Sequence, residues 1–152
     1  MVSQNSYFEF AENDYLFFKE AYLAGLKRPT LAAIGQSICE RYLKHIIHEY
    51  ANPENEYEQF TKTSILHSHS LNKLVKYMRD DMGITIPDET KNNLQKIDGF
   101  YFTTRYPGDD SFVPDEDDID DTWQAVKNTR ATVLHLIHKI EKNDSSCDEW
   151  EQ

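Results

Sequence analysis

The sequence predicts an all-α protein, an antiparallel up-and-down helical bundle of four main helices and one short helix. Apolar residues recur at a spacing of three to four along several stretches, and Pro, Gly and Asn residues separate these stretches. The 152 residues, 39% of them hydrophobic, are enough to bury one core without disulfides or metals. We therefore expect residues 1–152 to form a single domain, with its core between about 13 and 142.

The stretch from Thr30 to Ala51 is expected to be the central helix. Its first apolar stripe is Leu31, Ile34, Ile38, Tyr42 and Ile46; its second is Gly35, Cys39, Leu43, Ile46 or Ile47, and Tyr50. A surface helix needs only one such stripe, so this helix must be covered from two directions. Thr30 is the expected N-cap, directly after Pro29.

Before this helix, residues 1–12 are expected to pack as an irregular arm. A first helix should start at Asn13 or Asp14 and run to about Lys27, and it should form an antiparallel hairpin with the central helix. Its expected buried stripe is Tyr15, Phe18, Tyr22 and Leu26.

After it, a short helix is predicted over 57–66, and another helix from Ser68 or His69 to Gly83, which should occupy the usual C′ position. Asp88 is expected to cap a helix that continues through Tyr101 and ends before Pro107–Gly108. Residues 109–121 contain eight carboxylates, and we expect them to form a solvated loop and the acidic first turns of the last helix. The last helix is predicted over 120–142, and 143–152 as a frayed acidic tail.

The charge balance limits the function classes. The net charge of −11 argues against general duplex-DNA binding, which needs a basic surface, but it leaves room for a pocket built from a few Arg or Lys side chains. Cys39 and Cys147 lie in a helix and a polar tail and show no metal-ligand spacing, which fits a reducing cytoplasm. No signal peptide and no membrane span is predicted.

Three short patterns occur in order along the chain. The central helix contains Gln36-Ser-Ile-Cys-Glu40-Arg41-Tyr-Leu-Lys44, a later helix opens with His69-Ser-Leu, and Tyr101 to Pro107 read YFTTRYP. Together they resemble the HEPN family of small helical bundles. This resemblance implies an up-and-down bundle, a homodimer, and a cleft near the dimer axis that binds a nucleotide or RNA phosphate. It also implies a place in a toxin–antitoxin or defence module, with a nucleotidyltransferase or antitoxin as partner.

The family's ribonucleases use Arg followed, after roughly four to six residues, by His. One match exists, Arg130-Ala-Thr-Val-Leu-His135. Arg can hold a scissile phosphate and His can move the 2′-hydroxyl proton without a metal. Two features count against the pair: Ala131 replaces a polar residue, and five helical steps rotate His135 about 140° from Arg130. The alternative for Arg130 is an ion pair with Asp or Glu of a neighbouring helix.

Arg105 and His69 are the other candidates for a nucleotide- or phosphate-binding site, together with Arg130. Arg105 ends an apolar stripe at a turn, where it could bind a phosphate or bridge to Asp98 or Asp109. His69, at a helix start, could be a cap or a cleft base. His45 and His48, like His135 and His138, have an i, i+3 spacing that metals can use, but solvated or core roles are favoured. No cofactor is implied.

Three functional hypotheses follow from the sequence. The first is a dimeric protein, without enzymatic activity or weakly active, that binds a nucleotide or RNA phosphate in an Arg-lined cleft. The second is a metal-independent ribonuclease toxin that uses Arg130 and His135. The third is a non-catalytic interaction partner of a nucleotidyltransferase.

Overall fold

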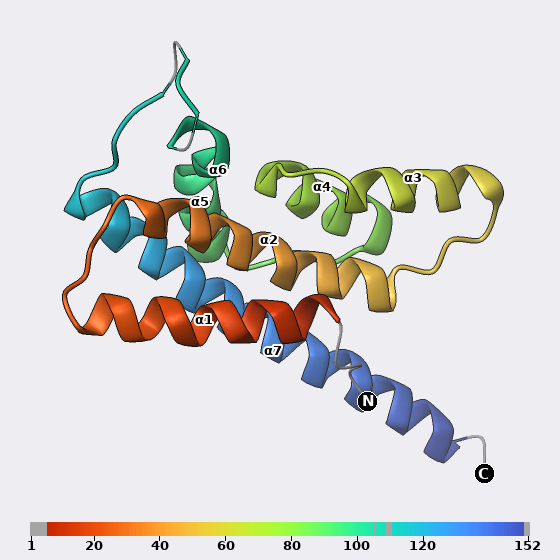
Figure 1. Ribbon diagram of the computed structural model, residues 1–152. Coiled ribbons are helices and arrows are strands. Elements are labelled where there is room, and N and C mark those ends of the chain that lie inside the picture. The colour runs from red at the N-terminus through yellow and green to blue at the C-terminus, as the bar shows by residue number, and fades with distance from the viewer. Residues whose placement is uncertain (1–5, 105, 109–110, 151–152) are drawn as a thin grey trace.

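A computed structural model of the chain describes residues 6–104, 106–108 and 111–150, with side chains up to Asn143 (Figure 1). Within these residues the protein is all-α, as predicted, with seven helices and no strand. The helices are α1 (Tyr7–Leu23), α2 (Thr30–Tyr50), α3 (Glu56–Leu66), α4 (Leu71–Met82), α5 (Asp88–Ile97), α6 (Phe100–Thr103) and α7 (Glu116–Trp150). This is more than the four main helices and one short helix expected.

The central position of α2 is confirmed. It contacts every other helix in the described part of the chain. α1 runs antiparallel to it, α7 crosses behind both, and α3 and α4 lie on the side of α2 away from α1 (Figure 1). Both predicted stripes are buried: Ile38 and Tyr42 of the first and Cys39 and Leu43 of the second are 0% exposed. The rest of the bundle is therefore built around α2, which holds the candidate site in place.

Both ends of the first helix differ from the prediction. α1 begins at Tyr7 and not at Asn13, because the side chain of Ser6 accepts a hydrogen bond from the backbone N–H of Glu9. Ser followed three residues later by Glu is a capping-box sequence. The helix ends at Leu23 and not at Lys27, and Gly25 then turns the chain with φ +80°, a conformation that favours glycine.

Three caps also differ from the prediction. Pro29, and not Thr30, is the N-cap of α2. Ser70, and not Ser68 or His69, caps α4, and Pro87 precedes the first residue of α5, Asp88. Gly83 does occupy the C-cap of α4 in the left-handed conformation, as expected.

The helix predicted to continue from Asp88 to Tyr101 is interrupted at Gly99, whose φ is +91°. The interruption has a structural cause at Asp98. Its carboxylate accepts hydrogen bonds from the backbone N–H groups of Leu71 and Asn72 at 2.8 and 3.2 Å and from the Ser70 hydroxyl at 3.1 Å. Asp98 thus satisfies free N–H groups at the start of α4, and the chain must leave the helical path to reach them.

α7 is longer than predicted at both ends. It begins at Glu116 and not at Asp120, and its helix continues to Trp150 through most of the segment expected to be a frayed tail. Trp123 joins α7 to α1, where it stacks against Tyr15, Phe18 and Tyr22 with ring centroids 5.2–6.2 Å apart. This aromatic cluster packs one side of the core.

Candidate functional site

The Gln36 side chain connects two distant segments, at His69 and at Tyr101, to α2 by hydrogen bonds. It is 0% exposed, and its amide Nε2 donates to the backbone carbonyl of His69 at 2.9 Å. Its Oε1 accepts a hydrogen bond from the backbone N–H of Tyr101. The segment before α4 and the start of α6 are therefore held side by side on one face of α2.

Glu40 lies one turn further along the same face and holds the His69 side chain. Its Oε1 is 3.1 Å from Nδ1 of His69, and its Oε2 accepts from Lys44 Nζ at 3.2 Å. The Glu40 and Lys44 side chains are 12% and 6% exposed, whereas that of His69 is 55% exposed. A buried ion pair thus presents an imidazole to solvent.

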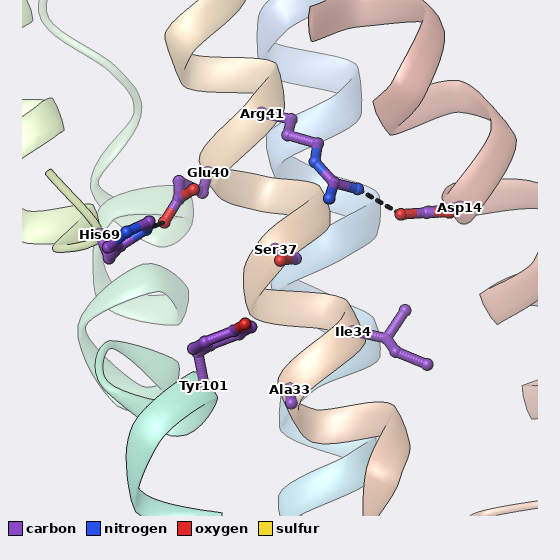
Figure 2. A pocket seen from close by; sticks show the side chains of 8 residues that line it. All are labelled: Asp14, Ala33, Ile34, Ser37, Glu40, Arg41, His69 and Tyr101. Carbon is purple, nitrogen blue, oxygen red and sulfur yellow. Dashed lines mark hydrogen bonds and ion pairs between the residues drawn. The ribbon is translucent and has the colours of Figure 1, made fainter. Parts of the chain in front are cut away.

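A pocket of about 320 Å³ opens beside this histidine (Figure 2). Its lining residues come from α1, α2, α6 and the segment before α4: Asp14, Ala33, Ile34, Ser37, Glu40, Arg41, His69 and Tyr101. Arg41 and Glu40 leave α2 in opposite directions, Arg41 toward Asp14 of α1 and Glu40 toward His69 (Figure 2). The pocket therefore has a guanidinium on one side and an imidazole on the other.

Aromatic rings border the His69 side of the pocket. The His69 ring is stacked on Tyr101, with centroids 6.2 Å apart and planes 12° apart. Phe102, 49% exposed, meets both rings edge-on at 5.9 and 5.2 Å. Planar, partly exposed rings of this kind are surfaces on which an unstacked base can pack.

The charges around the pocket nearly cancel. Arg41 and Lys44 balance Asp14 and Glu40, in a chain whose net charge is −11. Any protonation of His69, or any displacement of Asp14 from Arg41, makes the pocket locally positive. A small anion in this pocket would meet both an Arg and a His side chain.

Arg130 is held in a separate network on α1. Its Nε and Nη2 donate to the two carboxylate oxygens of Glu12 at 2.8 and 3.2 Å, and its guanidinium lies over the Tyr15 ring, 4.6 Å from the centroid. The Tyr42 hydroxyl also donates to Glu12, at 2.6 Å. Arg130 thus makes the ion pair with a neighbouring helix that was the alternative to a catalytic role.

This network also sets protonation states. Burial alone would raise the pKa of Glu12, but the hydrogen bonds from Arg130 and Tyr42 and the charge of Arg130 outweigh it, so the pKa lies below its ordinary value. Burial, and then the hydrogen bond to Glu12, raise the pKa of the Tyr42 hydroxyl. Glu12 is therefore a carboxylate at neutral pH, and Tyr42 stays protonated.

The structure places the His135 side chain apart from the Arg130 network. It is exposed and lines a different pocket, formed with the connector Thr85–Pro87 and with Thr132 and Lys139 of α7. The two side chains therefore face different neighbours, as the 140° helical rotation predicts. Arg105 lies outside the described residues. Among the described side chains, no group of three or more His, Cys, Asp or Glu residues could hold a metal ion.

The comparison with family models now identifies the bundle. The HEPN domain model matches residues 59–139, more than half of the chain. The chain belongs to the HEPN family. The matched range contains His69, Arg130 and His135, whereas Glu40 and Arg41 of the pocket precede it. Comparisons with curated proteins and with solved structures give no match.

Within this HEPN bundle, no described helix is both long and apolar enough to cross a membrane. Of the predicted site residues that the structure describes (His69, Arg130 and His135), His69 alone lines the pocket described above. Arg41, Glu40 and Ser37 were missed as site residues, although Glu40 and Arg41 carried the family resemblance. Their spacing on α2 was the available signal, because residues 37 and 41, and residues 40 and 44, are one helical turn apart.

Proposed function

We propose that this HEPN protein binds the phosphate of a ribonucleotide or of a single-stranded RNA in the pocket between Arg41 and His69. The observation that carries the proposal is the convergence of these two side chains, with Ser37 and Tyr101, in one cavity. Arg offers several N–H donors in a planar fork, the geometry that suits a phosphate. The exposed His69 and Phe102 rings lie where a base could stack.

Binding would exchange one anion for another. Arg41 is paired with Asp14, and both side chains are partly exposed, at 35% and 43%. An exposed ion pair of this kind contributes little free energy, so a phosphate with several acceptor oxygens can displace Asp14 at small cost. The acidic exterior of the protein opposes non-specific binding of nucleic acid, which leaves recognition to the pocket.

Replacing Arg41 by Ala should weaken binding of a short single-stranded RNA by about tenfold or more, because a hydrogen bond to a charged group contributes about 1.5–3 kcal/mol. Fluorescence anisotropy with a labelled oligonucleotide measures it, and unlabelled ribonucleoside monophosphate as competitor shows whether a single nucleotide suffices. Arg79→Ala is the matched control, since Arg79 is paired with Asp80 and does not line the pocket. Equal binding by the wild type and Arg41→Ala would contradict the proposal.

We also propose that the protein is a homodimer and that the exposed face of α1 is its interface. Four apolar side chains on this face are exposed: Phe10 at 51%, Leu16 at 55%, Phe17 at 57% and Leu23 at 68%. They lie on one side of a helix of 17 residues, about 25 Å long. Several large exposed apolar side chains on one face of a helix indicate an interaction surface.

The order of residues on this face favours a second copy as the partner. Apart from Lys19, the exposed positions of α1 are 10, 13, 16, 17, 20 and 23, and they read Phe, Asn, Leu, Phe, Glu, Leu. The pattern of apolar and polar residues is symmetric about the point between Leu16 and Phe17. A two-fold axis there would place Phe10 against the Leu23 position of an antiparallel copy, and Asn13 against Glu20. Such self-complementarity is the requirement of an isologous dimer.

Phe17→Asp is expected to convert the dimer into a monomer of 17.9 kDa without lowering the melting temperature of the bundle. A charge on this face would have to be buried unpaired in the dimer, whereas it stays hydrated in the monomer. Light scattering at micromolar concentration measures the mass. Phe60→Asp on α3, a side chain 70% exposed, is the control and should remain dimeric. A wild-type monomer would exclude this interface.

A further inference from the structure

We propose that a second pocket, between α3 and the end of α4, binds a guanidinium group, supplied by an Arg side chain of a partner polypeptide. The inference goes beyond the phosphate-binding proposal and does not depend on it, because the two pockets share no lining residue. α3 and α4 lie side by side on the same side of α2 (Figure 1). The pocket between them has a volume of about 390 Å³. Its lining includes three acidic residues and two tyrosines: Glu54, Glu58, Asp81, Tyr57 and Tyr77.

The three carboxylates of this pocket have no cation of the protein beside them. Among the described side chains, none of the three makes an ion pair. Lys62 is the one cation of α3, and it donates instead to the carbonyl oxygens of His48 and Ala51, at 3.0 and 2.9 Å. One oxygen of Glu58 accepts the backbone N–H of Glu54 at 2.7 Å, which leaves the other oxygen for a ligand. The pocket therefore gathers negative charge that a bound cation would neutralise.

The pocket also contains a largely buried hydroxyl without a partner. Tyr77 is only 9% exposed, and its hydroxyl makes no hydrogen bond to any described residue. Burial, and then the charges of Asp81 and Glu58, raise the pKa of this hydroxyl, so both carboxylates lie near it and it stays protonated at neutral pH. Tyr77 borders a neighbouring pocket too, but the two carboxylates that act on its hydroxyl line this one. Buried polar groups are normally hydrogen-bonded, and an N–H donor in the pocket would satisfy the Tyr77 oxygen.

The combination of tyrosine rings and carboxylates favours a guanidinium over other cations. Tyr57 lines the pocket with a side chain that is 78% exposed, so its ring face is open to a ligand. A guanidinium is planar and weakly hydrated, and it stacks on aromatic rings while its N–H groups donate to carboxylates. Among the described residues, no three acidic, His or Cys groups lie close enough to share a metal ion. The five N–H donors of a guanidinium point in several directions, so they can reach carboxylates that are too far apart for one ion.

The surroundings of the pocket favour an Arg side chain of a polypeptide over a small free cation. Phe60 lies one turn from Tyr57 on α3 and is 70% exposed, so the apolar surface of α3 continues past the pocket. A polypeptide would cover Phe60 as well as fill the pocket, whereas a small cation would use the pocket alone. Arg is enriched among the residues that anchor protein interfaces. The net charge of −11 attracts a basic partner from a distance.

The experiment titrates the protein with a capped peptide, Gly-Leu-Arg-Leu-Gly, and follows the backbone amide signals of residues 51–61 and 77–81 by NMR. Asp81→Asn should weaken binding by about tenfold, because it removes a charged hydrogen-bond acceptor. Tyr77→Phe keeps the ring in the core and removes only the hydroxyl, so it should weaken binding by about threefold. Asp80→Asn is the matched control and should bind like the wild type. It changes the net charge equally, but Asp80 is paired with Arg79 and does not line the pocket.

Three further ligands test the chemistry and its source. The same peptide with Lys in place of Arg should bind at least about threefold more weakly, and the peptide with neutral citrulline should not bind. Agmatine carries the guanidinium without a polypeptide. Phe60→Ser should weaken binding of the Arg peptide but not of agmatine. Agmatine that binds as tightly as the peptide would keep the guanidinium site but overturn the polypeptide as its source.

Several results would overturn the guanidinium site itself. One is an Arg peptide that does not shift these signals at millimolar concentration. Another is equal weakening by Asp81→Asn and Asp80→Asn, which would mean that only the net charge matters. Equal binding of the Arg and Lys peptides would show that the pocket does not select a guanidinium. Arg41→Ala should leave all these titrations unchanged, so this inference and the phosphate-binding proposal fail or stand separately.

Discussion

Replacing Ile38 by Asp is expected to abolish folding of the whole domain. Ile38 is 0% exposed on α2, the helix that contacts every other helix of the described chain. An ionised carboxylate there would have no partner, and burying an unpaired charge costs several kcal/mol or more. That is comparable with the entire free energy of unfolding of a small domain, about 5–15 kcal/mol. Circular dichroism should show no cooperative thermal transition.

The control for this substitution is Ile38→Val, which removes one methylene and adds no charge. It should lower the free energy of unfolding by about 0.5–1.5 kcal/mol and leave the transition cooperative. A soluble Ile38→Asp protein with a sharp melting transition would mean that this face of α2 is not the core of the bundle.

Much of the fold could be predicted because the central helix, α2, has a periodic pattern of apolar residues. Two apolar stripes on one helix require cover from two sides, and this physical requirement alone placed 30–51 at the centre of the bundle. The antiparallel pairing with the preceding helix followed from the short connection. These features are local in sequence, and periodicity reports them directly.

Helix boundaries depend on finer interactions. The capping-box sequence at Ser6 and Glu9 starts α1 earlier than the predicted Asn13 or Asp14. The interruption at Gly99 could not be predicted in the same way. It arises because Asp98 caps α4, a helix that starts 27 residues earlier in the chain. Such tertiary hydrogen bonds leave no periodic trace in the sequence.

In the candidate site too, local features could be predicted from the sequence and tertiary contacts could not. His69 was singled out because it opens a helix, and the rotation between Arg130 and His135 correctly predicted that the two side chains face different neighbours. The partner of Arg41 is Asp14 on another helix, and Glu40 meets His69 only because Gln36 fastens that segment to α2. Which polar residues converge in a pocket is decided by long-range packing, and helical spacing on one element does not report it.

The packing of α2 against α7 depends on the absence of a side chain at Gly35. A Cβ added there would lie 2.1 Å from Cγ2 of Thr122 on α7 and 3.1 Å from Cε2 of Phe18 on α1. Thr122 is itself 0% exposed, so its methyl group has no free space into which to move. The two helices approach closely because one of them carries glycine at the contact.

Gly35→Ala is therefore expected to destabilise the protein by about 2 kcal/mol, even though alanine is the better helix former by about 1 kcal/mol. For a domain of this size the melting temperature should fall by about 4–8 °C. Thermal denaturation followed by circular dichroism measures the shift. The direction is informative, because at an uncrowded helical position the same substitution would stabilise.

The double variant Gly35→Ala, Thr122→Ser tests the cause. Serine lacks the Cγ2 methyl that the new Cβ would meet, but it keeps the hydroxyl that donates to the Asp118 carbonyl at 2.7 Å. Thr122→Ser alone should cost about 0.8 kcal/mol, the value of one buried methyl group. In the double variant the alanine methyl fills the vacated space, so the two changes should be less destabilising together than their separate effects predict, with a coupling of about 1 kcal/mol or more. Strictly additive effects would show that the close contact between α2 and α7 does not limit the residue at position 35.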